Sequence, residues 1–294
     1  MSEDIMDWLN PSKPQEPDPP ESVPPKVQEE LEKTAEKLTA PTVPAINVKY
    51  PSAKEFILLM QAVKVIIVEA VWTFTDELRV RAMDPSHVAM LDLTIPYEAW
   101  EEWDVPGDWH TGVNVEWVLR SLPKPKKDED TLRLETVPDR DRLRWTVQTG
   151  SLKRSVEFNL LALEPEEIPI IKIDFKAKLR LTVEALKTII EDAGKIAENI
   201  RVETPDGEKV TFSASGDMGP YSVTLDKYTE DLLALEVREP TKATYSLSYL
   251  KASVDAAAKL TETVSLSWAN NMPLKLDVEL LKTTLSYWIA PYVE

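Results

Sequence analysis

Apolar and polar residues follow two different periods along the chain, and each change of period marks a predicted element. Apolar side chains spaced three and four residues apart predict a helix that begins after Ser52, a suitable N-cap, and a second helix near 114–122. The buried face of the first helix would comprise Phe56, Leu59, Met60, Val63, Ile66 and Ile67. Elsewhere apolar and polar residues alternate, which is typical of antiparallel strands with one solvated face. Such segments lie at 78–82, 131–137, 142–149 and 152–160.

The same order of elements repeats after residue 171. An alternating strand at 172–183 leads into a predicted helix at 184–197, and the turn Pro205-Asp206-Gly207 joins two short strands into a hairpin. Another helix is predicted at 249–260, followed by strands at 263–268, 274–279 and 284–290. The pattern therefore predicts an α+β fold of two similar domains, each an antiparallel sheet with two helices on one face. Its predicted parts are domain 1 at 46–160, a proline-interrupted connecting loop at 161–171 and domain 2 at 172–294.

Residues 1–45 differ from the rest in composition. They hold nine of the 23 prolines, no glycine, and ten acidic residues against four lysines. Such a segment buries too little apolar surface to offset its ordering entropy, so we predict a disordered acidic tail. The tail carries −6 of the net charge of −17, a charge that by itself argues against a nucleic-acid partner. Its apolar cluster Ile5, Met6, Trp8 and Leu9 is either a short docking motif or a few apolar residues in a tail.

Composition excludes several classes of chemistry. The 294 residues include no cysteine, two histidines and seven glycines, which excludes disulfides, thiolate metal sites and multi-histidine metal sites. The sequence has no Walker A, GxGxxG, HExxH or GxSxG motif, so we expect no catalytic residues, no metal and no cofactor. An acidic-site hydrolase stays open as an alternative, since two of the many carboxylates could lie together. No apolar run reaches the roughly 20 residues of a membrane span, and we expect a soluble intracellular protein without a membrane partner.

Three segments, in the correct order, resemble one protein family. Residues 82–91 (AMDPSHVAML) resemble the MDSSHV turn of sliding clamps of the proliferating cell nuclear antigen (PCNA) type, with Pro85 replacing the usual small residue. Residues 210–219 (VTFSASGDMG) resemble the FSASGELG segment of that family, and 287–294 (YWIAPYVE) are similar to its C-terminal YYLAPKIE. The segment 161–171 stands where these clamps carry their interdomain connecting loop. The resemblance covers the chain from about residue 45 to residue 294 and is of the archaeal kind.

The resemblance implies a DNA-clamp fold and a scaffold function without catalysis. Three subunits would form a ring around duplex DNA and tether DNA polymerase, flap endonuclease and ligase type clients, and a separate clamp loader would open the ring. The ring would be a homotrimer or a heterotrimer. A checkpoint-type clamp subunit is the alternative within the same fold. The protein would be cytoplasmic and nucleoid-associated in an archaeon, or nuclear in a eukaryote.

The resemblance also implies three sets of site residues. Helices lining the hole would supply the DNA-facing Lys64, Arg120, Lys187, Lys195, Lys251 and Lys259, although Ile57 and Leu58 stand where relatives often carry a basic pair. A ring holds DNA by topology, so weak phosphate contacts suffice. The client pocket would use Met83, His87, Val88, Met90, Ile168, Ile170, Pro273, Trp288, Ala290 and Pro291. Edge strands of neighbouring subunits would pair through Leu152, Val156, Phe158, Tyr221, Val223 and Leu225.

Overall fold

The computed structural model describes residues 43–137, 140–165, 168 and 172–293. The predicted tail at 1–45 therefore lies outside the described residues except for its last three positions. The described residues from 43 onward form one compact unit. It contains antiparallel sheets and four α-helices, which confirms the predicted α+β class.

The first half of the chain opens with a short strand that the hydrophobic pattern did not predict, β1 (Asn47–Tyr50). Helix α2 (Ala53–Lys64) follows where it was expected, and so does the second helix, α3 (Val115–Ser121). A single turn of 3₁₀-helix, η1, spans Tyr97–Ala99. The remaining strands are β2 (Glu69–Phe74), β3 (Glu77–Met83), β4 (Ala89–Pro96), β5 (Glu102–Asp104), β6 (Trp109–Asn114), β7 (Thr131–Thr136), β8 (Arg142–Thr149) and β9 (Leu152–Asn159).

The second half repeats the helix and strand order, as predicted. Its helices are α4 (Val183–Ala193) and α5 (Leu247–Ala257). Strand β10 (Ala177–Thr182) begins five residues later than the alternation at 172–183 indicated. The other strands are β11 (Asn199–Thr204), β12 (Lys209–Gly216), β13 (Gly219–Asp226), β14 (Leu232–Val237), β15 (Thr241–Ser246), β16 (Thr263–Trp268), β17 (Leu274–Glu279) and β18 (Thr284–Ile289).

The strands form three sheets, one of which belongs to both halves. A five-stranded sheet (β5-β1-β7-β8-β9) lies within the first half, and a four-stranded sheet (β13-β12-β11-β15) lies within the second. The nine-stranded sheet runs β14-β10-β16-β17-β18-β4-β3-β2-β6 and crosses between the halves where β18 pairs with β4. The connecting loop is thus not the only link between the two domains, because main-chain hydrogen bonds also join them.

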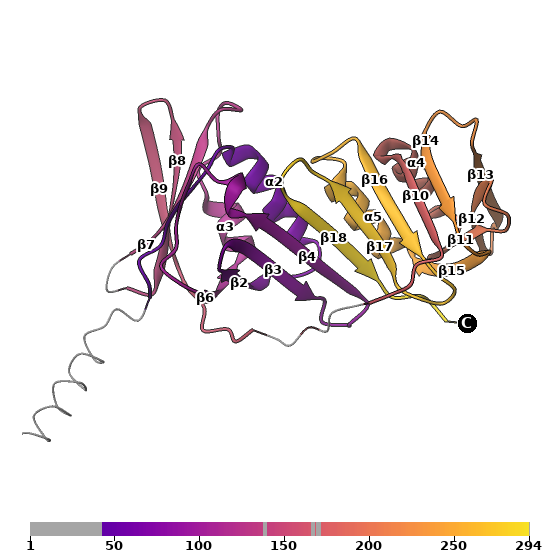
Figure 1. The fold of residues 1–294 in the computed structure, drawn as a ribbon, viewed down its shortest axis with the longest axis horizontal. Coiled ribbons are helices and arrows are strands. Elements are labelled where there is room, and N and C mark those ends of the chain that lie inside the picture. The colour runs from indigo at the N-terminus through magenta and orange to yellow at the C-terminus, as the bar shows by residue number, and fades with distance from the viewer. Residues whose placement is uncertain (1–42, 138–139, 166–167, 169–171, 294) are drawn as a thin grey trace, which may run out of the picture. The chain divides into compact units, whose positions relative to one another are not determined.

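The four helices form one layer. Helix α2 contacts α3 and α5, and α5 contacts α4. In Figure 1, α2, α4 and α5 lie behind the strands of the nine-stranded sheet. Side chains at the helix starts accept backbone N–H groups: Ser52 caps α2, Asn114 caps α3 and Thr182 caps α4. The apolar faces of the helices point toward the sheets, and Phe56, Leu59 and Met60 of α2 are almost completely buried.

Aromatic side chains build much of the core of the first half. Phe56 of α2 makes edge-to-face contacts with Tyr50, Trp100 and Trp145, at centroid distances of 5.4, 5.9 and 5.8 Å. Trp72 and Trp145 lie 5.5 Å apart. Such pairs contribute about 0.5–1.5 kcal/mol each beyond the burial of their apolar area. They fix the helix layer against the sheets of this half.

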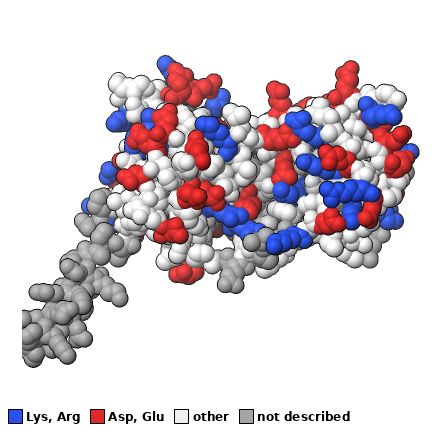
Figure 2. All heavy atoms as spheres, in the orientation of Figure 1, with Lys and Arg blue, Asp and Glu red and all other residues white. Residues whose placement is uncertain are grey.

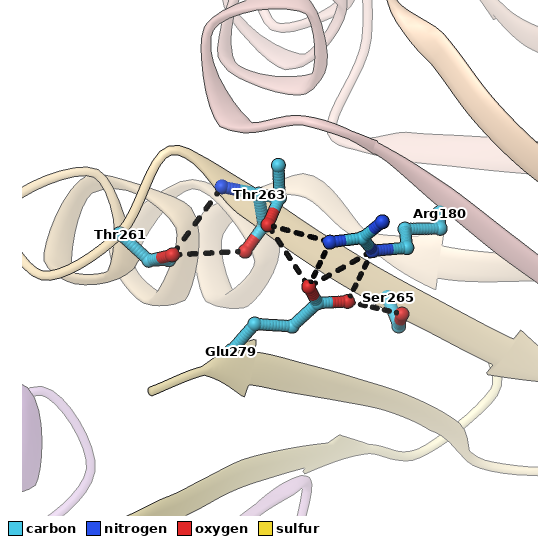
Figure 3. A network of polar contacts seen from close by, with 5 residues as sticks. All are labelled: Arg180, Thr261, Thr263, Ser265 and Glu279. Carbon is cyan, nitrogen blue, oxygen red and sulfur yellow. Dashed lines mark hydrogen bonds and ion pairs between the residues drawn. The ribbon is translucent and has the colours of Figure 1, made fainter. Parts of the chain in front are cut away.

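A polar network ties three strands together on the outward face of the nine-stranded sheet (Figure 3). The Arg180 guanidinium of β10 donates to both carboxylate oxygens of Glu279 on β17, at distances between 2.6 and 2.9 Å. Glu279 also accepts from the hydroxyls of Thr263 and Ser265 on β16, each at 3.0 Å. These hydrogen bonds, that from Arg180 above all, lower the pKa of Glu279 to about 2 although partial burial opposes the change.

Candidate functional site

The predicted client-pocket residues come together at one end of strands β3, β4, β17 and β18. Strand register places Met83 opposite Met90, Met90 opposite Trp288, and Trp288 opposite Lys275. All four side chains alternate with core residues, so they form one row across the outward face of the nine-stranded sheet. Segments about 200 residues apart in sequence thus meet in one row.

Asp84 shapes the turn between β3 and β4. Its carboxylate accepts the backbone N–H groups of Ser86, Val88 and Ala89, at 3.0, 2.7 and 2.6 Å. Burial opposes ionisation of this carboxyl, but the hydrogen bonds outweigh it and hold its pKa below the ordinary value. His87 at the tip has a positive φ of 58°, an uncommon conformation for a residue other than glycine. The ionised side chain therefore pins a turn that presents His87 and Val88.

The turn and the C-terminal segment form one wall of the site. The Ala290 N–H donates to the Val88 carbonyl at 2.8 Å, so the end of β18 continues alongside the turn. Pro291 forms an isolated bridge with Tyr245. The Tyr245 hydroxyl donates to the carbonyl of Met272, next to the predicted Pro273. These contacts bring three predicted segments together: the turn between β3 and β4, the C-terminal segment and the late turn at Pro273.

A cavity of about 750 Å³ lies between the connecting loop and the outward faces of β2 and β3. Of the predicted pocket residues, Met83 and Ile168 line it. The Arg81 Nη1 donates to the Ile168 carbonyl at 3.3 Å, which attaches the loop to β3. The predicted Ile170 lies outside the described residues.

Two placements change the predicted pocket. Met90 stands in the outward row but is only 2 % exposed, so its side chain is covered and offers little surface to a client. Its position in the continuous apolar run Ala89-Met90-Leu91 hid this, because such a run has no clear outward face. Phe175, which the sequence did not single out, packs against Trp288 with a centroid distance of 6.0 Å. On the same ring, Lys275 places its Nζ 5.4 Å from the centroid.

The six predicted DNA-facing side chains lie on the helix layer or just after a helix end, and five are exposed while Lys187 is half-buried. Three of them form ion pairs within the chain: Lys64 with Glu116, Lys195 with Asp192, and Lys251 with Glu191 and Asp255. Within the described residues, the other three have no acidic partner within 4.0 Å. These three are Arg120, Lys187 and Lys259.

Charges on the helix layer nearly balance. The basic residues of the four helices are Lys54, Lys64, Arg120, Lys187 and Lys251, and the acidic ones are Glu55, Glu116, Glu184, Glu191, Asp192 and Asp255. On the opposite, outward face, acidic and basic side chains are interspersed (Figure 2). The four helices by themselves, with five basic against six acidic side chains, therefore carry no net positive charge.

A cluster of lysines in the loop after α3 was not predicted. Lys124, Lys126 and Lys127 are exposed, and the three line one groove with the helix residues Ile57 and Leu58. The signal that could have found them is three lysines within four positions directly after a predicted helix. The loop places their charge next to the helix layer.

The two strands predicted to form subunit contacts are both sheet edges. Strand β9 pairs with β8 and β13 pairs with β12, and neither has a second partner among the described strands. Both are eight residues long. Val156, Phe158, Tyr221 and Val223 are half-buried against the core, and Leu152 is exposed. Leu225 is 7 % exposed and belongs to the core, so it offers little surface to a neighbour.

Two further classes of site find no candidate in the part of the chain that the structure describes. None of the helices there is long and apolar enough to cross a bilayer. Within the same residues, histidine and acidic side chains form no group of three or more that could hold a metal ion.

The family models and the relatives found by comparison with known proteins all belong to one family. The model for "Proliferating cell nuclear antigen, N-terminal domain" matches residues 46–167, and the model for its C-terminal domain matches 169–292. "DNA polymerase sliding clamp 1" of Pyrobaculum aerophilum is 31% identical over 247 residues, which cover 83% of this chain and 97% of that protein. The protein of the same description from Thermococcus kodakarensis is 33% identical over 250 residues, 84% of this chain and 98% of that protein.

Solved structures agree on the fold. The crystal structure of PCNA from Thermococcus kodakaraensis matches with a TM-score of 0.77 at 24% identity, over 84% of this chain and 100% of that chain. These relatives favour neither the checkpoint-type subunit nor the acidic-site hydrolase. Because both domain models match in order and the sliding-clamp relatives align over most of the chain, the protein belongs to the proliferating cell nuclear antigen family of sliding clamps.

Proposed function

We propose that this protein is a DNA polymerase sliding clamp that closes as a ring of three subunits around duplex DNA and tethers replication and repair enzymes. The observation that carries the proposal is the match of both clamp domains, in order, over residues 46–292. The clamp acts as a scaffold, and its mechanism is topological: the ring keeps an attached polymerase on the template. It acts inside the cell, in association with chromosomal DNA.

Ring closure would join β9 of one subunit to β13 of the next. Both strands leave one row of backbone N–H and C=O groups without a strand partner among the described residues. Edge strands of equal length suit main-chain pairing, and pairing would cover the half-buried Phe158 and Val223 at the same time.

The assembly is tested by native mass spectrometry of the protein alone and mixed with any paralogous subunits of its organism. A trimer of this chain alone supports a homotrimer, and a trimer only in the mixture supports a heterotrimer. The same samples, loaded on a primed template, should lengthen the products of the cognate DNA polymerase. A chain that stays monomeric in every mixture and leaves product length unchanged contradicts the proposal.

Duplex DNA would contact the helix layer and the loop after α3, which carries Lys124, Lys126 and Lys127, through its phosphates alone. Arg120, Lys187 and Lys259 lack acidic partners within the described residues, and Lys124 and Lys126 are exposed in the loop that follows α3. Removing one phosphate contact should lower the slope of log retention against log salt by about 0.9.

The DNA contact is tested with the triple variant Lys124→Gln/Lys126→Gln/Lys127→Gln. Rings of this variant, loaded on linear duplex, should show a shallower salt dependence of retention than the wild type. The control Lys178→Gln removes an exposed lysine from the outward face of β10 and should leave the slope unchanged. Equal slopes for all three proteins would contradict the assignment of the loop to DNA.

The client pocket would bind short peptides with aliphatic and aromatic anchors. Its exposed or half-buried lining among the described residues consists of Met83, His87, Val88, Ile168, Pro273, Trp288, Ala290 and Pro291. Large, adaptable side chains such as Met and Trp suit a surface that accepts several partners. DNA polymerase, flap endonuclease, ligase and clamp loader are the partner classes that such a pocket would serve.

A further inference from the structure

The Asp84 carboxylate has a fourth hydrogen-bond donor, which comes from the other half of the chain. The hydroxyl of Tyr249, the third residue of α5, donates to Asp84 Oδ2 at 2.7 Å. The two residues are 165 positions apart. The other donors are backbone N–H groups of the turn itself. Among the described residues, Tyr249 is therefore the hydrogen-bond donor that links this carboxylate to the second half of the chain.

The turn depends on this carboxylate more than an ordinary turn would. Asp84 is 5 % exposed, and a buried carboxylate that loses a donor is costly to keep in place. His87 holds a positive φ, a conformation that persists when the surroundings fix it. Displacement of Asp84 would therefore move the backbone of Val88 and Ala89 with it.

The wall of the client pocket that the turn and the C-terminal segment form follows the position of this turn. His87 and Val88 belong to the turn, and the Val88 carbonyl accepts the Ala290 N–H at 2.8 Å. A shift of Val88 would thus be transmitted to the C-terminal segment that carries Ala290 and Pro291. Met83, which precedes Asp84, lines the cavity beneath the connecting loop.

We propose that Tyr249 is a positioning residue for the client pocket: its hydroxyl holds Asp84 and so fixes the turn at 84–89 from the opposite half of the chain. Helix α5 also carries Lys251, one of the expected DNA-facing residues. One helix therefore supplies a side chain to each of the two surfaces. The proposal rests on the proposed clamp function, because it needs the pocket to bind clients.

The test compares two variants that each delete one buried or half-buried tyrosine hydroxyl. Tyr249→Phe removes the donor to Asp84. Tyr287→Phe is the matched control, because its hydroxyl also joins the two halves, donating to the Ala62 carbonyl at 3.0 Å, but does not touch the turn. A fluorescent synthetic peptide from the cognate DNA polymerase, chosen for its aliphatic and aromatic anchor residues, serves as the probe. The readouts are its Kd, the amide NMR signals of Val88 and Ala89, and the thermal midpoint.

Tyr249→Phe should raise the Kd of the peptide about tenfold, which corresponds to about 1.4 kcal/mol of binding free energy. It should also shift the amide signals of Val88 and Ala89. Tyr287→Phe should lower the thermal midpoint, leave those amide signals in place and keep the Kd within about twofold. In an Asp84→Asn background, Tyr249→Phe should have little further effect on the Kd, because both changes break the same contact.

Failure of the inference and failure of the proposed function give different results. If the wild type binds the peptide and Tyr249→Phe binds it equally well, the positioning role is wrong, whether or not the amide signals move. An equal loss of affinity in Tyr249→Phe and Tyr287→Phe also overturns it, since general destabilisation would then explain both. If the wild type binds no client peptide although it forms trimers, the pocket assignment fails and this inference fails with it.

Discussion

The ion pair between Arg180 and Glu279 predicts by how much, and in which direction, the free energy of unfolding changes when Glu279 loses its charge. Replacing Glu279 by Gln keeps the shape of the side chain but removes its charge, and leaves Arg180, Thr263 and Ser265 with a weaker acceptor. A pKa lowered from 4.5 to about 2 corresponds to at most about 3 kcal/mol of stabilisation at neutral pH. The Glu279 side chain is 31% exposed, and solvent screening reduces the expected loss to about 1–2 kcal/mol.

The pH dependence follows from the direction of the change in pKa. Because the pKa of Glu279 is lower in the folded chain than in the unfolded chain, its contribution is fully present above pH about 4.5. It is lost as the pH falls toward about 2. The free energy of unfolding of Glu279→Gln should therefore lie below that of the wild type at pH 7, and the difference should narrow as the pH falls below about 4.5.

Urea unfolding at several pH values, at one protein concentration, measures the difference. The control is Glu129→Gln, which removes the same charge from an exposed ion pair with Lys127 at 3.6 Å and should change the free energy of unfolding by less than about 0.5 kcal/mol. The reasoning is refuted if Glu279→Gln is as stable as the control variant at pH 7. It is also refuted if the difference from the wild type stays constant down to pH 3.

Three further outcomes are expected. Val223→Glu on edge strand β13 should convert the trimer to monomers in light scattering while the far-UV circular dichroism stays unchanged, because the added charge would lie in the subunit junction. Gly216→Ala should lower the free energy of unfolding by about 1–3 kcal/mol, since its Cβ would overlap the Ile196 carbonyl oxygen, whereas Gly107→Ala has free space and should be neutral by the same urea titration. Asn114→Ala should cost about 1 kcal/mol by removing the N-cap of α3, and thermal unfolding would detect a loss of this size.

Helix positions and most strands could be predicted because each periodicity reports directly which face is buried. The cap residues Ser52 and Asn114 were readable for the same reason, since a polar side chain stood just before an apolar period. Strand β1 was missed because four residues are too few to show alternation. The start of β10 was placed too early because the residues before Ala177 also alternate, although they follow the connecting loop.

The alternation of apolar and polar residues could not predict which strands pair with each other. Alternation gives the inward and outward face of a strand but not its neighbour, so the pairing of β4 with β18 across the two halves could not be foreseen. The same limit applies to the site. The resemblance brought Met83, Val88 and Trp288 together, but the supporting contacts of Asp84 and Tyr249 depend on which helix packs behind which turn. Such long-range contacts have no local signature.

The sheet shared by the two halves has a mechanical consequence for a ring that must open. Strands β4 and β18 are paired at six positions, from Thr94 with Thr284 to Ala89 with Ile289. Bending one subunit at its middle would break this ladder, whereas parting two subunits would break one edge-to-edge contact and leave every sheet intact. In the proposed ring, opening should therefore separate two subunits at a junction rather than bend one subunit. Each subunit would move as a rigid body, so a small rotation at the junctions that stay closed would open a wide gap for DNA at the junction that parts.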